Sequence, residues 1–230
     1  MNCKLDIIAI IPARGGSKSI VSKNLAILGG KPLLCWPIET ALATSEINNI
    51  IVSTDNDKIA EVATELGVGI HHRPPELGLD SALVVDTVRH IYQELIGKKK
   101  SADIFVLLEA TSPLRTPELV SRCLKRLVQE NLDSIATFHV AEVNPERAWR
   151  IENGKPFPFI DGAIPWKPRQ EFPPAYHLNG AVYAFRPGRL PAESLGLLFG
   201  KMGAELIDSN SIIDIDDERD LKVANALLES

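Results

Sequence analysis

The fold of this chain is decided near its start by residues 5–16, which read LDIIAIIPARGG. The apolar run from Leu5 to Ile11 is nearly continuous, as in a strand that is buried on both faces of a sheet. Pro12 ends the run, and Gly15 and Gly16 follow, where the backbone can turn sharply. This order predicts a central strand of a parallel sheet, followed by a loop that can approach a ligand closely.

The rest of the chain alternates in the same way. We expect further strands at 49–54, 103–108, 134–140, 180–185 and near 204–207. We expect helices at 32–43, 57–66, 81–96, 117–129, near 191–199 and at about 218–228. Strands that alternate with helices predict an α/β fold, with a mostly parallel twisted sheet covered by helices on both faces.

One segment departs from this alternation. Residues 144–174 contain seven prolines and two tryptophans and show little helical periodicity. Proline removes a backbone donor and disfavours helices and central strands. We therefore expect a proline-rich arm within a single domain that covers residues 1–230.

Composition limits the partners and the compartment. The 230 residues are 45% hydrophobic and carry a net charge of −5, which suits one globular domain and argues against nucleic acid or an anionic membrane as a partner. No run reaches transmembrane length, and the first apolar run is too short for a signal peptide. Cys3, Cys35 and Cys123 form no CxxC pair, which indicates reduced thiols and a cytoplasmic protein.

Polar residues follow several predicted strands, at the edge of the sheet where ligands of such folds bind. They are Arg14 to Lys18, Ser53 to Asp55, Glu109, Thr111 and Ser112, with Asp214 and Asp216 near the end of the chain. We expect these distant segments to meet in one crevice.

The loop after the first strand reads PARGGSK from Pro12 to Lys18, and Lys23-Asn24 follows. Its glycines can bring N–H groups close to an anion, and Arg14, Lys18 and Lys23 add three cations, which suits a polyphosphate. The loop matches neither GxxxxGK[ST] nor GxGxxG. A basic surface loop with a glycine turn is the alternative.

Asp214 and Asp216 are two residues apart, so on an extended segment both side chains point to the same side and can face one hard cation. The alternative is that the acidic run 214–220 caps the last helix. His71 and His72 are expected in a loop. As neighbours they would make poor joint metal ligands, and His90 and His139 are expected to be structural.

Several motifs together resemble one family in order along the chain. They are the PARGGSK loop with Lys23-Asn24, IVSTD at 51–55, Arg73-Pro74 with Asp80-Ser81, TSPLR at 111–115, PRQ at 168–170, NGAVY at 179–183 and IDID at 213–216. This series is similar to that of the CMP-sialic acid synthetases, the N-acylneuraminate cytidylyltransferases. The resemblance implies a Rossmann-like nucleotidyltransferase that works as a homodimer through the arm and, with Mg²⁺, couples CTP to a nine-carbon 2-keto sugar acid, giving a CMP-sugar and pyrophosphate.

The resemblance also implies roles for individual residues. The nucleotide-binding residues would be Arg14, Gly15, Gly16, Ser17, Lys18, Lys23, Asn24, Arg73 and Ser81. The catalytic residues would be Arg14, Lys23 and Asp216, and Mg²⁺ would bind Asp214 and Asp216. The acceptor would contact Glu109, Thr111, Ser112, Arg169, Gln170, His177, Asn179 and Tyr183.

Departures from the family pattern leave the acceptor open. Ser19 replaces a glycine, Glu109-Ala110 stands where Gln-Pro is common, and His177-Leu178 stands where an arginine-bearing pair is frequent. Sialic acid, a legionaminic acid and a deaminated nonulosonate are all compatible with these residues. A cytidylyltransferase of the CMP-KDO type is the alternative enzyme, and a nucleotide-sugar-binding protein without turnover is the alternative class.

Overall fold

A computed structural model describes residues 5–16, 19–208 and 213–229, so Ser17 and Lys18 lie outside the described residues. Its main sheet has seven strands in the order β11-β7-β10-β6-β1-β4-β5. Their bounds are β1 (Ile7–Pro12), β4 (Asn49–Thr54), β5 (Gly69–His72), β6 (Ile104–Leu107), β7 (Ser134–Val140), β10 (Tyr176–Phe185) and β11 (Met202–Leu206). The helices are α1 (Cys35–Ala43), α2 (Asp57–Glu65), α3 (Val84–Gly97), α4 (Pro117–Gln129) and α5 (Glu218–Glu229).

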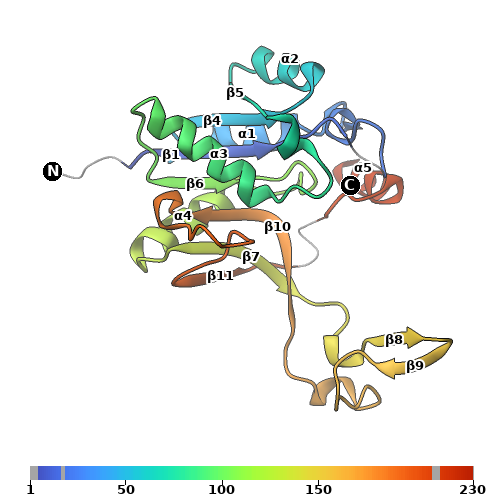
Figure 1. Cartoon of the computed structure of the whole chain (residues 1–230). Helices are drawn as coiled ribbons and strands as arrows, with labels where there is room; N and C mark the ends of the chain where they lie inside the picture. Colours follow the sequence, from blue (N-terminus) through green and yellow to red (C-terminus); the bar gives the residue numbers. More distant parts are fainter. Residues whose placement is uncertain (1–4, 17–18, 209–212, 230) are drawn as a thin grey trace.

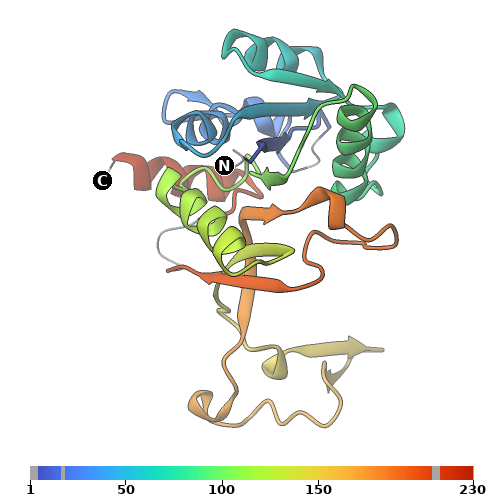
Figure 2. The same cartoon turned by 90° about the vertical axis from the view of Figure 1, so that its left-hand side faces the viewer.

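The prediction of a mostly parallel sheet with helices on both faces is confirmed. Strand β1 pairs in parallel with β4 and β6, β4 with β5, and β7 with β11, while β10 runs antiparallel to both β6 and β7. Figure 2 shows α3 on one side of the sheet and α4 on the other. The carboxyl ends of β1, β4, β5 and β6 therefore share one edge with the start of β10.

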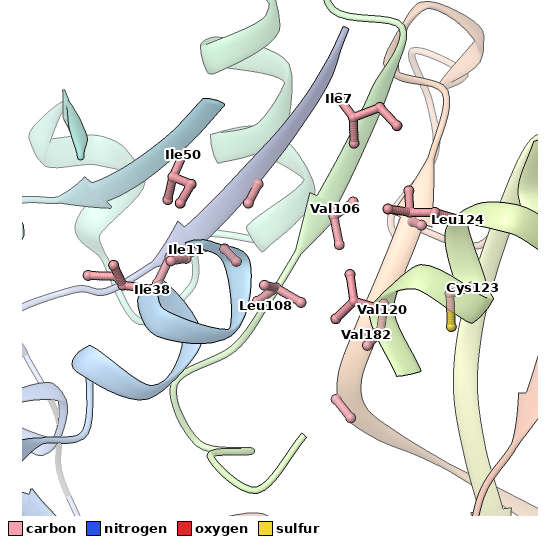
Figure 3. Close-up of a cluster of buried hydrophobic side chains, with 14 of the residues drawn as sticks. Ile7, Ile11, Ile38, Ile50, Val106, Leu108, Val120, Cys123, Leu124 and Val182 are labelled. Atoms are coloured by element: carbon pink, nitrogen blue, oxygen red, sulfur yellow. The ribbon is translucent and has the colours of Figure 1, made fainter. Parts of the chain in front are cut away.

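Alternation along β1 explains why its apolar run is continuous. Ile7, Ala9 and Ile11 pack into a core with residues of α1, α2 and α4, part of which Figure 3 shows. Ile8 and Ile10 point to the other face and pack against α3. Each of these five side chains is at most 6% exposed, so both faces of β1 contribute to the hydrophobic stabilisation of the sheet.

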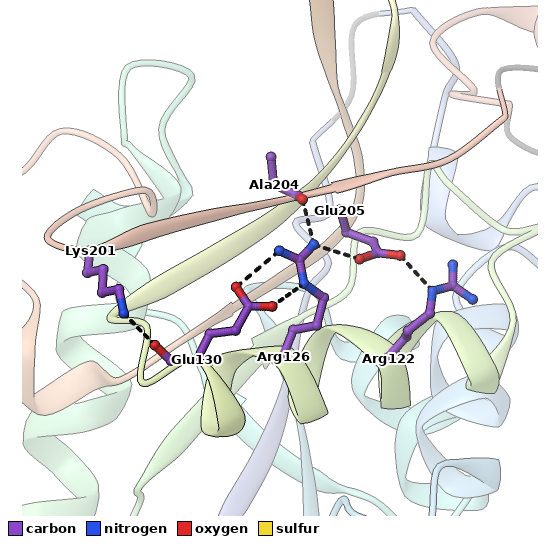
Figure 4. A network of polar contacts seen from close by, with 6 residues as sticks. All are labelled: Arg122, Arg126, Glu130, Lys201, Ala204 and Glu205. Carbon is purple, nitrogen blue, oxygen red and sulfur yellow. Dashed lines mark hydrogen bonds and ion pairs between the residues drawn. The ribbon is translucent and has the colours of Figure 1, made fainter.

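Helix α4 is fixed at its start by a cap and along its length by charges. Thr116 accepts a hydrogen bond from the backbone N–H of Leu119, which satisfies a donor of the first turn. Figure 4 shows Arg122 and Arg126 on either side of Glu205, an 8% exposed carboxylate on the edge strand β11. This pairing joins the helix to an edge strand of the sheet.

The segment between β7 and β10 extends away from the sheet, as Figure 1 shows. It contains a small antiparallel hairpin of β8 (Trp149–Glu152) and β9 (Lys155–Pro158). A second small pair, β2 (Ile27–Leu28) and β3 (Lys31–Pro32), lies close to the first loop and precedes α1. Among the described residues, none of the helices is both long and apolar enough to cross a bilayer.

Two local predictions are wrong. His71 and His72 lie on the edge strand β5 rather than in a loop, and His71 is buried there. Residues 191–199 form turns instead of a helix. Two carbonyls of this segment are hydrogen-bonded by a side chain of α3: Arg89 Nη2 donates to the backbone oxygens of Pro191 at 2.8 Å and Ser194 at 2.6 Å.

Candidate active site

A cavity of about 530 Å³ opens at the carboxyl ends of the central strands. Its walls bring together predicted site residues from five separate segments: Arg14, Gly16, Lys23, Asn24, Arg73, Glu109, Thr111, Asp214 and Asp216. Ser81 is exposed and does not line this cavity, although its neighbours Asp80 and Ala82 do. The cavity is where the crevice was expected from the topology of a parallel sheet.

The first loop is fastened to the end of β4. The backbone N–H of Gly15 donates to Asp55 Oδ1 at 2.7 Å, and a Cβ at Gly15 would lie 2.8 Å from that of Asn56. A larger residue would therefore push the loop away from the sheet. Asn24 Nδ2 donates to the backbone oxygen of Arg14 at 2.9 Å, which closes the loop from its other end.

Cations and carboxylates face each other across the cavity. Arg14 Nη1 lies 2.8 Å from Asp80 Oδ1, and Lys23 Nζ lies 3.3 Å from Asp216 Oδ1. Lys23 Nζ also donates to the backbone oxygen of Ile215 at 3.0 Å. The lysine side chain is only 14% exposed, so its position is well determined by contacts between the first loop and the last segment of the chain.

Packing of Ile215 directs the two aspartates. Ile215 is fully buried in a small core with Leu28, Leu33 and other apolar residues of the first loop and α5. Its backbone N–H donates to the carbonyl of Thr111 at 2.8 Å. Because neighbouring side chains of an extended segment point to opposite sides, Asp214 and Asp216 both project outward into the cavity.

This pair has the donor chemistry of a magnesium site. Desolvation at the cavity wall raises the pKa of Asp214, and the nearby charge of Asp216 raises it further, against a hydrogen bond from Thr111. A divalent cation would relieve that repulsion. Mg²⁺ commonly takes one or two protein carboxylates and completes its shell with water and phosphate oxygens. Asp214 and Asp216 therefore fit the ion.

Glu109, which is partly buried and lines the cavity, forms a polar pair with the buried Arg115. Burial, followed by the charge of Asp214, raises the pKa of Glu109 from 4.5 to about 7. Burial lowers the pKa of Arg115 to about 9, and its Nη2 donates to the backbone oxygen of Glu109. Sequence reasoning gave Arg115 no role, although the residue ends the TSPLR motif. No local signal marks an arginine that will be buried.

Gly180 is required beside this pair. Its φ is +71°, and an added Cβ would lie 2.7 Å from Glu109 Oε2. The irregular register of β10 against β7 falls in the same stretch, between Leu178 and Tyr183. Ser112 Oγ donates to the backbone oxygen of Asn179 at 3.2 Å, so these predicted acceptor residues help to hold the irregular strand.

Arg73 follows β5 and is held by β4. Its Nε donates to Ser53 Oγ at 3.2 Å and its Nη2 to the Ser53 backbone oxygen at 3.0 Å. Burial lowers the pKa of this guanidinium, which still lines the cavity. The arginine is thus positioned before any ligand arrives.

A second cavity, of about 670 Å³, adjoins the first and shares Asp214 with it. His177 and Asn179 line it from β10, and His139 lines it from β7. The rings of His139 and His177 are 5.3 Å apart, and the buried His139 Nδ1 has no hydrogen-bond partner among the described residues. A polar ligand could therefore gain hydrogen bonds here.

The remaining predicted acceptor residues lie elsewhere. Arg169 lines a third cavity, of about 390 Å³, at the base of the projecting segment, together with Arg147. Gln170 is exposed and lines none of these three cavities. Tyr183 is partly buried in β10, where burial raises the pKa of its hydroxyl. Within this single chain, Arg169 and Gln170 are not brought to the first cavity.

Comparison with protein families gives one matching model, described as Cytidylyltransferase, over residues 8–191. The match covers the first loop, the central strands and the projecting segment.

Curated relatives carry related names. N-acylneuraminate cytidylyltransferase A of Danio rerio is 35% identical over 148 residues, which are 64% of this chain and 33% of the relative. CMP-N,N'-diacetyllegionaminic acid synthase of Legionella pneumophila is 33% identical over 186 residues, covering 77% of this chain and 76% of the relative. The chain spans only 33% to 42% of the N-acylneuraminate cytidylyltransferases from Danio rerio and Streptococcus agalactiae that it matches.

Solved structures share the fold over nearly the whole chain. CMP:2-keto-3-deoxy-manno-octonic acid synthetase, complexed with CTP, has a TM-score of 0.71 at 20% identity and covers 97% of this chain and 98% of that one. A 4-diphosphocytidyl-2C-methyl-D-erythritol synthase also has a TM-score of 0.71, at 14% identity, with 99% and 100% covered.

Proposed function

The chain belongs to the cytidylyltransferase family, and on this premise we propose that it transfers the CMP group of CTP to a nine-carbon 2-keto sugar acid. The products are a CMP-sugar and pyrophosphate. The observation that carries the proposal is the first cavity, where Arg14, Lys23 and Arg73 face Asp214 and Asp216. A triphosphate bound with a metal ion needs this combination of cations and carboxylates in one place.

The nucleotide occupies the first cavity. Arg14 and Lys23 neutralise the triphosphate, and the backbone N–H of Gly16, which lines the cavity, donates to its oxygens. Arg73 contacts the cytidine end from the opposite wall. Because the side chains of Arg14, Lys23 and Arg73 are already held by neighbours, little reorganisation is needed when CTP binds.

The acceptor occupies the second cavity, with its reacting hydroxyl extending past Asp214, at the shared wall, into the first cavity, where Asp216 lies. The oxygen on C2 of the sugar acid attacks the α-phosphorus, and the bond from that phosphorus to the leaving pyrophosphate breaks. We assign the hydroxyl proton to the carboxylate of Asp216 and stabilisation of the leaving group to Lys23. Mg²⁺, held by Asp214 and Asp216, supplies further neutralisation of the phosphate charge.

Polar groups of the second cavity suit an acidic sugar. The unpartnered His139 Nδ1 and the neighbouring His177 offer ring nitrogens to hydroxyls or a carboxylate. Glu109, on the wall of the first cavity, accepts hydrogen bonds when ionised and also donates one when protonated. The similarity to the Legionella pneumophila synthase supports an acceptor of the nonulosonic acid class.

We further propose that the chain works as a homodimer through the segment 144–174. Trp166 is 82% exposed there, and Phe159 and Ile164 are also exposed, an unusual concentration of apolar surface. Arg169 and Gln170 of one subunit would then reach the acceptor cavity of the other. Light scattering should show a dimer, and Trp166→Lys should shift it towards a monomer. A wild-type monomer at assay concentration would contradict the proposal.

The free thiols of Cys35 and Cys123 support a reducing compartment, and we place the protein in the cytoplasm.

The activity is tested by pyrophosphate release from CTP and MgCl₂ with a panel of acids. The panel contains N-acetylneuraminic acid, a legionaminic acid, a deaminated nonulosonate and the eight-carbon KDO. Release with a nine-carbon acid supports the proposal, whereas release with KDO alone identifies the alternative enzyme. Binding of CTP without release from any acid would indicate a nucleotide-binding protein without turnover.

A further inference from the structure

Three side chains of types that can bind metals meet between β5 and α3. His71 lies on β5, and His90 and Glu94 lie one turn apart on α3. Their donor atoms are all within 4.8 Å of one another, and within the described ranges this is the single group of three or more such residues found. The group lies apart from Asp214 and Asp216 in both position and chemistry, because two of its three donors are nitrogens.

His71 is the fixed member of the group. Its side chain is buried, with the residue only 4% exposed. Ring Nδ1 is 2.9 Å from Ser53 Oγ, which leaves Nε2 directed at His90, where it lies 2.8 Å from Nδ1. Histidines that bind metals usually have their second ring nitrogen held by such a partner, which sets the tautomer and the ring orientation.

His90 and Glu94 are the adjustable members, with side chains 37% and 41% exposed. Glu94 Oε1 lies 3.9 Å from His90 Nδ1, while Glu94 Oε2 is held at 2.9 Å by Lys98 Nζ. The lysine thus orients the carboxylate so that its other oxygen faces the two imidazoles. Arg73 lies on the far side of Ser53, whose hydroxyl it also contacts.

We propose that His71, His90 and Glu94 bind a divalent transition-metal ion of the zinc type, with water as the fourth ligand. Two imidazoles and a carboxylate are a zinc donor set, whereas Mg²⁺ prefers oxygen alone. With Zn–N bonds of about 2.0–2.1 Å, tetrahedral geometry separates ligand atoms by roughly 3.3 Å. The present separations of 2.8 and 3.9 Å lie on either side of that value, so small rotations of the two exposed side chains complete the site.

The tautomers are compatible with binding. When the ion binds, the proton between the two imidazoles moves through solvent to the other nitrogen of the ring that carries it, so that His71 is protonated on Nδ1, where it donates to Ser53 Oγ, and His90 on Nε2. Both imidazoles then present a lone pair to the ion without loss of a further hydrogen bond inside the protein.

The test is calorimetric titration of the full chain with ZnCl₂ in excess MgCl₂, which saturates oxygen-only sites. Co²⁺ is added in parallel, because its visible spectrum reports nitrogen ligands. The variants are His90→Gln and Glu94→Gln, whose side chains are exposed and whose folding is checked by circular dichroism. His72→Gln is the matched control, since it removes the adjacent exposed histidine, and His177→Gln controls for the second histidine pair.

We expect one Zn²⁺ per chain, retained in both controls. Loss of a residue that only hydrogen-bonds to a metal ligand weakens metal binding by roughly 10- to 100-fold. His90→Gln and Glu94→Gln each remove a ligand itself, so each should weaken Zn²⁺ binding by more than this. Absence of Zn²⁺ binding by the wild type would overturn the proposal. So would undiminished binding by folded His90→Gln and Glu94→Gln variants, or loss of binding in His177→Gln instead.

Discussion

Replacement of Glu109 by glutamine should change how the stability of the protein depends on pH. The carboxyl group has a pKa of about 7 in the folded protein and an ordinary value of 4.5 in the unfolded chain. Between these values the folded state binds more protons than the unfolded state, so the free energy of unfolding falls as pH rises. Glutamine keeps the shape of the protonated side chain and cannot ionise.

The size of the effect follows from the two pKa values. Ionisation of a group with a pKa raised from 4.5 to about 7 costs the folded state about 1.4 kcal/mol for each pH unit of the difference, or about 3 kcal/mol in full. Between about pH 5 and pH 8, the stability of Glu109→Gln relative to the wild type should therefore rise by about 2–3 kcal/mol. In a chain of this size, this corresponds to a change in relative Tm of roughly 4–12 °C.

The assay measures urea unfolding by circular dichroism across this pH range. EDTA is present so that no divalent cation screens the charge of Glu109. Glu61→Gln is the control, because Glu61 is exposed on α2 and should leave the pH profile unchanged. If the wild type and Glu109→Gln gave parallel profiles of stability against pH, Glu109 would not be the group held protonated by burial, and the reasoning would be refuted.

Three further changes test the site and the fold. Lys23→Ala should lower turnover by about 10²- to 10³-fold, because it removes a fixed cation beside the leaving phosphates; unchanged steady-state kinetics in a folded variant would exclude that role. Asp216→Asn should raise the Mg²⁺ concentration needed for half-maximal activity by at least about tenfold, and an unaltered Mg²⁺ titration would leave Asp216 as a helix-capping residue. Thr116→Ala should destabilise the protein by about 1 kcal/mol in urea unfolding without altering kinetics, since it removes the side-chain cap at Leu119; an unchanged midpoint would show that solvent replaces the cap.

The central strands could be predicted because a strand that is buried on both faces requires a nearly continuous run of apolar residues. Strands β4 and β7 and helix α4 have the predicted bounds, and β1 and β6 differ by one or two residues at their ends. Edge strand β5 was missed because Gly69 and two histidines lack the apolar run of a central strand, and only one side of an edge is paired. The composition of residues 191–199 favoured a helix, but the segment forms turns. Composition could not reveal that Arg89, distant in sequence, donates to the carbonyls of Pro191 and Ser194.

The sequence predicted which segments would converge where the topology of the sheet alone determines their position. Arg14, Glu109 and Asp214 meet because each follows, or packs beside, the end of a central strand. Arg169 and Gln170 were predicted by resemblance, and in this single chain neither residue lines the first cavity. Arg115 was missed for a different reason: its burial depends on tertiary packing around Glu109, which no local pattern records.

The attachment of the projecting segment has a consequence for how specificity can change. Strands β7 and β10 extend out of the sheet side by side and connect it to the projecting segment. The outer parts of these two strands supply His139 and His177 to the second cavity. A mutation that changes the tilt of these two strands therefore also changes the width of the second cavity. Under the proposed dimer, with the acceptor in the second cavity, a change of acceptor should therefore be accompanied by a change in the strength of subunit association.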